Sequence, residues 1–153
     1  MLDTTLRSRK RSVGGFSLVE ALIVVVILGI LTLLVVPRFD PVLANRNVKS
    51  ARQSFTGLYN RARMAAVQNR VTATVTITGN VASAAVTTTW GGTQNVGTAV
   101  LFEDDYGVTA TASPTTVSIE PSGLVRTGLP FSLVLARSAV RDTVRITGYG
   151  RIE

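Results

Sequence analysis

The sequence predicts an α+β protein with a long apolar helical segment, an amphipathic helix and a small antiparallel β domain. Residues 16–36 form an almost unbroken apolar block, and after it apolar residues recur every three or four positions as far as residue 65. At Val71 the period changes to two, as in a half-buried strand. We therefore expect a leader at 1–15, a membrane-length helix at 16–36, an amphipathic helix at 37–70 and a β domain at 71–153.

The apolar block is long enough to cross a bilayer. As a helix its 21 residues extend about 31 Å, and the hydrocarbon core of a bilayer is about 30 Å thick. The flank before it is basic, Arg7-Ser8-Arg9-Lys10-Arg11. Because positively charged flanks stay in the cytoplasm, the N-terminus is predicted to be cytoplasmic, and the C-terminal domain lies across the membrane.

Two ordinary explanations of this block leave one residue unexplained. A plain signal anchor accounts for the length and the charge bias. A cleaved secretory signal would need an apolar region of about 7–15 residues; Val42-Leu43-Ala44 could be its cleavage site, but the block is too long and Pro41 is too near. Neither explains Glu20, the only charge in the block, since a carboxylate in a membrane helix costs about 2.5–3.5 kcal/mol.

The segment Gly15-Phe16-Ser17-Leu18-Val19-Glu20 resembles the prepilin processing signature of type IV pilins and type II secretion pseudopilins. The resemblance implies that a prepilin peptidase cuts between Gly15 and Phe16 and methylates the new amine of Phe16. Glu20 then takes the family's glutamate position, while Gly29 and Pro37 take positions where the helix is weakened in assembled filaments.

Glu20 has a physical role in such a filament. It lies one helical turn from Phe16, so its carboxylate can pair with the new amine of its own chain or with that of a neighbour. Pairing between chains satisfies both charges only when the subunits are correctly staggered, so it would set their register. Apolar side chains alone do not set it, because lipid is equally apolar.

The helix predicted after the block has one apolar stripe. Pro37 is expected to kink it and Pro41 to interrupt it again, near the outer edge of the membrane. The stripe consists of Val48, Ala51, Phe55, Leu58, Ala62 and Ala65. The arginines of this helix lie mostly off the stripe, where they are solvated or contact neighbouring subunits.

The remaining residues predict a β domain of about 80 residues, whose core the helix completes. Thr78-Gly79-Asn80-Val81 predicts a hairpin turn. The strands are expected near residues 71–77, 81–88, 98–103, 107–112, 115–120, 131–136 and 142–147.

This part of the chain is similar to the GspH/FimT group of minor pilins and pseudopilins. The similarity lies in Ala62-Arg63-Met64-Ala65-Ala66, in Val117-Ser118-Ile119-Glu120-Pro121-Ser122-Gly123, and in Val144-Arg145-Ile146-Thr147-Gly148-Tyr149-Gly150-Arg151-Ile152. It implies a pilin-like fold, in which the outer half of a long transmembrane helix packs on a small antiparallel β-sandwich.

The composition argues against an enzyme. The chain has neither cysteine nor histidine, which removes catalytic thiols, thiolate metal sites and Ser-His-Asp triads. No cofactor and no metal are expected. The run Glu103-Asp104-Asp105 lacks the spaced ligands of a calcium loop, so it is interpreted as an exposed acidic turn rather than a metal site. Gly148-Tyr149-Gly150 is interpreted as a turn.

The net charge of +7 comes from the leader and the second helix, so it is weak evidence for nucleic-acid binding. However, some FimT-like minor pilins bind DNA during uptake through a C-terminal Gly-Arg-x-Arg motif. Here the corresponding residues are Gly150-Arg151-Ile152-Glu153, where an acid replaces the second arginine. Arg145 and Arg151 are the candidate DNA contacts, and Arg145 is expected on the solvent side of its strand.

Together these features predict a non-catalytic minor pseudopilin or minor pilin. It would be a single-pass protein of the bacterial inner membrane that enters a short periplasmic filament and assists its assembly in type II secretion. Its partners would be other pilin-like subunits, the prepilin peptidase and the inner-membrane assembly platform. The alternatives are a DNA-binding minor pilin of a type IV pilus and an uncleaved anchored domain.

Overall fold

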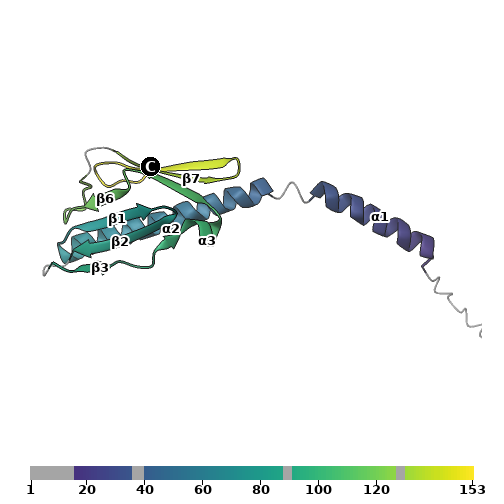
Figure 1. Ribbon diagram of the computed structural model, residues 1–153, viewed down its shortest axis with the longest axis horizontal. Coiled ribbons are helices and arrows are strands. Elements are labelled where there is room, and N and C mark those ends of the chain that lie inside the picture. Colours follow the sequence, from purple (N-terminus) through teal and green to yellow (C-terminus); the bar gives the residue numbers. More distant parts are fainter. Residues whose placement is uncertain (1–15, 36–39, 88–90, 127–129) are drawn as a thin grey trace, which may run out of the picture. The chain divides into compact units, whose positions relative to one another are not determined.

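The computed structural model describes residues 16–35, 40–87, 91–126 and 130–153 (Figure 1). The described residues form two units, which are considered separately. The first contains α1 (Leu18–Val35), and the second contains α2 (Asp40–Asn69) and all the strands. No helix in these described ranges meets the combined length and apolarity of a membrane span.

Helix α2 begins one residue before Pro41 and ends one residue before Arg70. Pro41 lies in the first turn of α2, where a missing N–H breaks no helical hydrogen bond. The interruption predicted at Pro41 therefore does not occur. At the other end Arg70 has a positive φ of 54°, and the N–H of Val71 donates to the carbonyl of Ala66. This left-handed residue and its hydrogen bond end the helix next to the first strand.

Two antiparallel sheets follow α2. In the first, β1 (Ala73–Thr78) lies between β2 (Val81–Thr87) and β6 (Thr116–Ile119), and β2 also pairs with β3 (Thr93–Asn95) and β4 (Val100–Leu101). In the second, β7 (Phe131–Arg137) lies between β5 (Thr109–Ser113) and β8 (Val140–Ile146). The predicted α+β class with antiparallel sheets is confirmed, as is the turn at Gly79, whose φ is 58°.

Two local predictions were wrong. The strand expected at 98–103 ends at Leu101, because Phe102 begins the short helix α3 (Phe102–Tyr106). A left-handed Gly107 ends α3, and its N–H donates to the carbonyl of Glu103. The short strand β3 was not expected, because all of its residues are exposed and show no alternation.

The core lies where α2 meets both sheets, and Figure 1 shows α2 running alongside them. Every buried residue of α2 except Tyr59 is apolar without a polar group, and the predicted stripe is confirmed except that Ala66, not Ala65, is fully buried. The ring of Phe55 is centred 6.0 Å from that of Phe131 in β7 and 6.5 Å from that of Phe102 in α3. Phe55 of α2 therefore packs against both β7 of the second sheet and the short helix α3.

Candidate functional site

The first candidate site is the start of α1. The N–H of Ala21 donates to the carbonyl of Ser17 at 3.1 Å, so the first helical hydrogen bond starts at Ser17 and the helix begins at Leu18, two residues after Phe16. Phe16 is 75% exposed. Glu20 lies in the first turn, where the positive end of the helix dipole favours a carboxylate. Phe16 and Glu20 are four residues apart in sequence, which is one turn when both are in helix.

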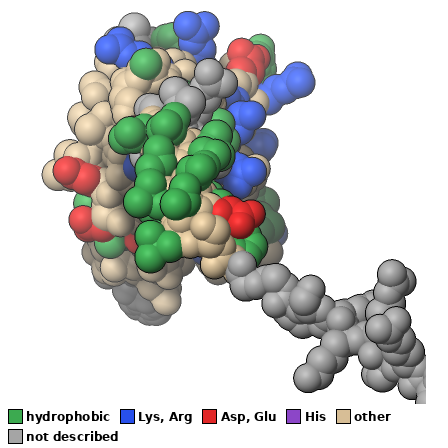
Figure 2. All heavy atoms as spheres, turned by 90° about the vertical axis from the view of Figure 1, so that its right-hand side faces the viewer, with side chains coloured by type: hydrophobic (Ala, Val, Ile, Leu, Met, Phe, Trp, Pro, Cys, Tyr) green, Lys and Arg blue, Asp and Glu red, His purple; other side chains and the backbone are tan. Residues whose placement is uncertain are grey.

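Apart from Glu20 and Thr32 the side chains of α1 are apolar, and none of the described residues of its unit buries them. Its large hydrophobic residues are exposed from Leu18 to Leu33. Exposed hydrophobic side chains form a broad group in the space-filling view (Figure 2). Soluble monomers rarely expose a patch of this size, so α1 is a surface made for lipid or for other helices.

The other residues predicted for the N-terminal site are placed as follows. Gly29 lies within regular helix, and a Cβ atom built on it would meet nothing within 4 Å. Gly15 and Pro37 lie outside the described residues, as does the whole leader 1–15. The weakening of the helix at Gly29 and Pro37 therefore stays a prediction.

The second candidate site is the outer face of β8 and the chain end beside it. The backbones of Arg145 and Glu153 exchange two hydrogen bonds, of 3.1 and 2.8 Å. Directly paired residues project their side chains to one face, so Glu153 lies on the same face as Arg145. The N–H of Thr147 donates to the carbonyl of Arg151, whereas the N–H of Arg151 donates to the hydroxyl of Thr147. Arg151 is exposed, while Val144 and Ile146 are buried on the other face of β8. The exposed position predicted for Arg145 is confirmed.

A shallow groove lies on this side of the second sheet. It has a volume of about 530 Å³ and is lined by Pro130, Phe131, Ser132, Val134, Thr143 and Arg145. Three of these residues are apolar, and the polar side chains among them carry two hydroxyls and one guanidinium. The groove therefore offers hydrogen-bond donors and a positive charge but no carboxylate of its own.

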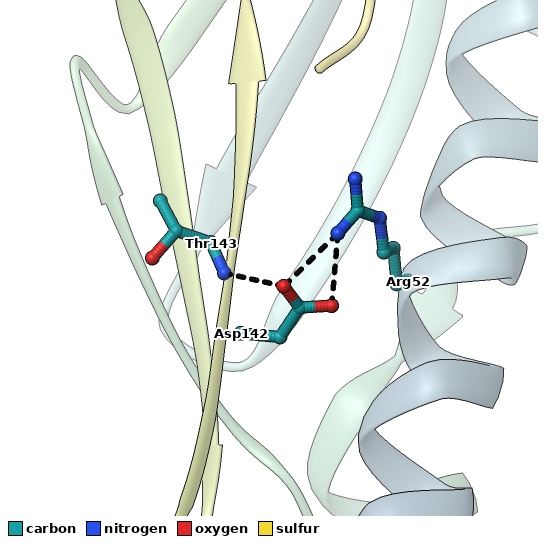
Figure 3. Close-up of polar contacts among 3 residues, drawn as sticks. All are labelled: Arg52, Asp142 and Thr143. Atoms are coloured by element: carbon teal, nitrogen blue, oxygen red, sulfur yellow. Dashed lines mark hydrogen bonds and ion pairs between the residues drawn. The ribbon is translucent and has the colours of Figure 1, made fainter.

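An ion pair joins α2 to the opposite, inward-facing side of β8 (Figure 3). Arg52 Nη1 donates to both carboxylate oxygens of Asp142, at 2.9 and 3.0 Å, and the backbone N–H of Thr143 donates to the same carboxylate at 2.8 Å. The side chains of Arg52 and Asp142 are 35% and 29% exposed. Asp142 thus occupies an edge-strand N–H that could otherwise pair with another chain.

Tyr59 and Arg63 of α2 donate hydrogen bonds to the C-terminal turn, which is formed by residues 147–151. The Tyr59 hydroxyl donates to the carbonyl of Gly150 at 3.2 Å, and Arg63 donates to the carbonyls of Gly123 and Gly150. Burial raises the pKa of the Tyr59 hydroxyl above its usual value, and the positive charge of Arg63 offsets part of the rise. The phenol therefore remains protonated and able to donate throughout the physiological pH range.

Sequence reasoning did not find these contacts. One signal was present for Asp142: it occupies the inward register of β8 with Val144 and Ile146, where an acid needs a basic partner. No comparable signal marks Tyr59, because an aromatic residue in the stripe of a helix fits an ordinary core.

The acidic run lies at the start of α3. Glu103, Asp104 and Asp105 are exposed in the first turn of α3, and Glu103 accepts a hydrogen bond from the side chain of Asn80. Within the described ranges no group of three or more acidic side chains is close enough to hold a metal ion.

Comparison with known proteins adds two findings. Residues 10–36 match the family described as the prokaryotic N-terminal methylation motif. FimU, a type IV minor pilin of Pseudomonas aeruginosa strain PAO1, has a similar structure in two crystal forms. The first has 14% sequence identity and a TM-score of 0.57, over 71% of this chain and 88% of FimU. The second has 16% identity and a TM-score of 0.53, over 69% and 90%. No curated protein sequence matches the chain significantly. At these identities the likeness to FimU concerns the fold.

Proposed function

We propose that this chain, which is type IV pilin-like in its N-terminal motif and its fold, is a non-catalytic minor subunit of a pilus or pseudopilus. It is made with a leader, cut after Gly15 and methylated on Phe16. The single-span helix 16–36 holds it in the inner membrane, with the N-terminus cytoplasmic and the β domain periplasmic, until it joins a periplasmic filament. One observation carries the proposal: a methylation motif, matched over residues 10–36, that contains an exposed apolar helix whose only charge is Glu20.

The mechanism is non-covalent. Among apolar helices that pack side by side, the pair formed by Glu20 and the amine of Phe16 on a neighbouring subunit is the contact that selects one stagger. A charge left alone in this environment is costly, so a wrong register is rejected. The prepilin peptidase and the inner-membrane assembly platform act on the chain before assembly, and other pilin-like subunits surround it afterwards.

The test is the substitution Glu20→Gln, which keeps the shape of the side chain and removes its charge. Breaking a buried ion pair costs about 3–5 kcal/mol, so we expect at least a hundredfold less of the variant in sheared filaments. Thr32→Val is the matched control in α1, because it removes only the hydroxyl that donates to the carbonyl of Leu28. If Glu20→Gln enters filaments as well as Thr32→Val does, the pairing mechanism is wrong.

Type II secretion is the first setting we propose, as assistance to assembly of the pseudopilus. The second is a type IV pilus, in which the chain binds DNA for uptake. The groove that includes Arg145 favours this second function, because its donors and positive charge suit a phosphodiester. Glu153 opposes it, because it places a negative charge opposite Arg145 on the same face.

A gel shift separates the two settings. DNA binding predicts retention that weakens with salt and is lost in the double variant Arg145→Ala/Arg151→Ala. Arg61→Ala/Arg70→Ala, which removes two exposed arginines of α2 and its end, is the control of equal charge. Retention that is equal in both double variants would remove the DNA-binding function.

A further inference from the structure

We infer that the first two turns of α2 form a surface that rests on the headgroups of anionic phospholipids before the subunit enters a filament. This inference rests on the proposed function, because it requires the chain to be anchored by residues 16–36. The surface consists of Val42, Leu43, Arg46 and Lys49, and we call it the juxtamembrane face.

These side chains share one side of α2. Val42, Arg46 and Lys49 follow one another at spacings of four and three residues, and Leu43 is three residues before Arg46, so all four project from adjacent positions. Val42 and Leu43 are each 49% exposed, although they begin the helix that builds the core. Asp40, the only acid of α2, is six residues before Arg46 and lies about 120° from it around the helix; it is three residues before Leu43, so it borders the apolar edge of this side and not the cationic one.

Nothing in the described residues uses these groups. The buried face of α2 is formed by other residues, beginning with Ala44 and Val48. Arg52, one turn further on, is paired with Asp142. In contrast, Arg46 and Lys49 make no ion pair with any other described side chain. Two exposed apolar residues and two unpaired cations are therefore free for an outside partner.

The chain keeps this face close to the bilayer. Val42 follows Val36, the end of the predicted span, by six residues, which reach at most about 21 Å when fully extended. Within the helix the order is apolar first and cationic second. That order matches a membrane interface, where apolar side chains enter the edge of the acyl region and long cationic side chains reach the phosphates.

The charge of the face selects the occupant. Each Lys or Arg near an anionic membrane contributes about 1 kcal/mol, which is about a fivefold shift in the ratio of docked to lifted helix. Arg46 and Lys49 together should shift that ratio about 25-fold. An uncharged lipid surface offers only the contact of Val42 and Leu43.

The experiment uses the full chain in vesicles and exploits its lack of cysteine. A nitroxide label on Val42→Cys reports collisions with oxygen, which dissolves in lipid, and with a nickel complex, which dissolves in water. The vesicles contain phosphatidylglycerol with phosphatidylcholine, or phosphatidylcholine alone. We expect the label to be shielded from nickel only in the anionic vesicles, and this shielding to be lost in high salt.

Two variants give the test its controls. Arg46→Gln/Lys49→Gln should expose the label to nickel in anionic vesicles, whereas Arg61→Gln/Arg70→Gln should leave it shielded. The same label on Gln53→Cys, about 16 Å further along α2, should stay exposed to nickel in both lipids.

Several results would overturn the inference. It fails if the label is shielded equally in uncharged vesicles, or if the two double variants behave alike. It also fails if shielding rises with the ratio of protein to lipid whatever the lipid charge, because the occupant would then be another copy of the chain. Flotation of the vesicles in high salt tests the anchor separately: a chain that does not float refutes the proposed membrane span, whereas a floating chain with an exposed label refutes only the docking.

Discussion

Replacing Asp142 with asparagine removes the charge that Arg52 binds while preserving the shape of the side chain. The amide oxygen can still accept the N–H of Thr143, so the substitution isolates the ion pair between α2 and β8. Fully exposed pairs contribute about 0.2–1 kcal/mol, and hydrogen bonds to charged groups about 1.5–3 kcal/mol. Because both side chains are about one third exposed, we expect a loss of about 1–1.5 kcal/mol.

The assay is a double-mutant cycle in urea with Arg52→Gln, Asp142→Asn and the combined variant. It can use residues 39–153, because every buried hydrophobic residue among the described ranges lies between Ala44 and Ile146. The coupling free energy should be about 1 kcal/mol, equivalent to about 4 °C in the melting temperature. It should fall in 1 M salt, since the pair is partly exposed.

A second pair in the same domain supplies the control. Arg126 Nε lies 3.8 Å from Glu120, and its side chain is 82% exposed, so Glu120→Gln should change the free energy of unfolding by less than about 0.5 kcal/mol. A coupling between Arg52 and Asp142 no larger than this, or one that salt leaves unchanged, would refute the reasoning.

Three further predictions concern the turn after α3, the C-terminal turn and the outer face of β8. Gly107→Ala should lower the free energy of unfolding in urea by about 1–2 kcal/mol, because φ at Gly107 is 59° and the new Cβ would lie 2.9 Å from a guanidinium nitrogen of Arg137. Gly79→Ala is the control and should cost less, because φ at Gly79 is 58° but the new Cβ would meet nothing within 4 Å. The pKa of Tyr59 is raised in the folded state. The contribution of its hydroxyl to stability should therefore be complete below about pH 10 and fall as the pH rises through the folded pKa. In Tyr59→Phe the free energy of unfolding should lack this part of its decrease at alkaline pH. Glu153→Arg should increase retention of DNA in a gel shift and steepen its salt dependence, because it places a cation opposite Arg145; an unchanged gel shift would show that this face does not meet phosphate.

Local patterns in the sequence predicted most of the elements. The apolar stripe from Val48 to Ala62 predicted α2, because a helix buries residues that are three or four positions apart. The alternation that begins at Val71 predicted β1, because a strand buries every second residue. The turn at Gly79 could be predicted for a similar reason, since its positive φ favours glycine.

The elements that were missed lack such a local signal. β3 has three exposed polar residues, and it is a strand only because β2 offers it an edge. α3 has five residues, and a buried Phe102 and the left-handed Gly107 define it. β3 and α3 both form because of the residues that surround them in space, and segments of three to five residues are too short for a periodicity that would predict them.

The candidate sites divide in the same way. Glu20 could be chosen as a candidate from the sequence because a single charge in an apolar block is unusual, and its role stays a prediction. The partner of Asp142 could not be found, since Arg52 is 90 residues away in the chain and several other arginines could have served. The opposition of Glu153 and Arg145 likewise required the backbone pairing that places them side by side.

Intact mass spectrometry of the chain isolated from its native membranes tests the central claim most directly. Proteolytic removal of the leader should leave a polypeptide that starts at Phe16, with one added methyl group located on that residue by fragmentation. A chain that still begins at Met1, or one cut at another bond such as that after Ala44, would contradict the account.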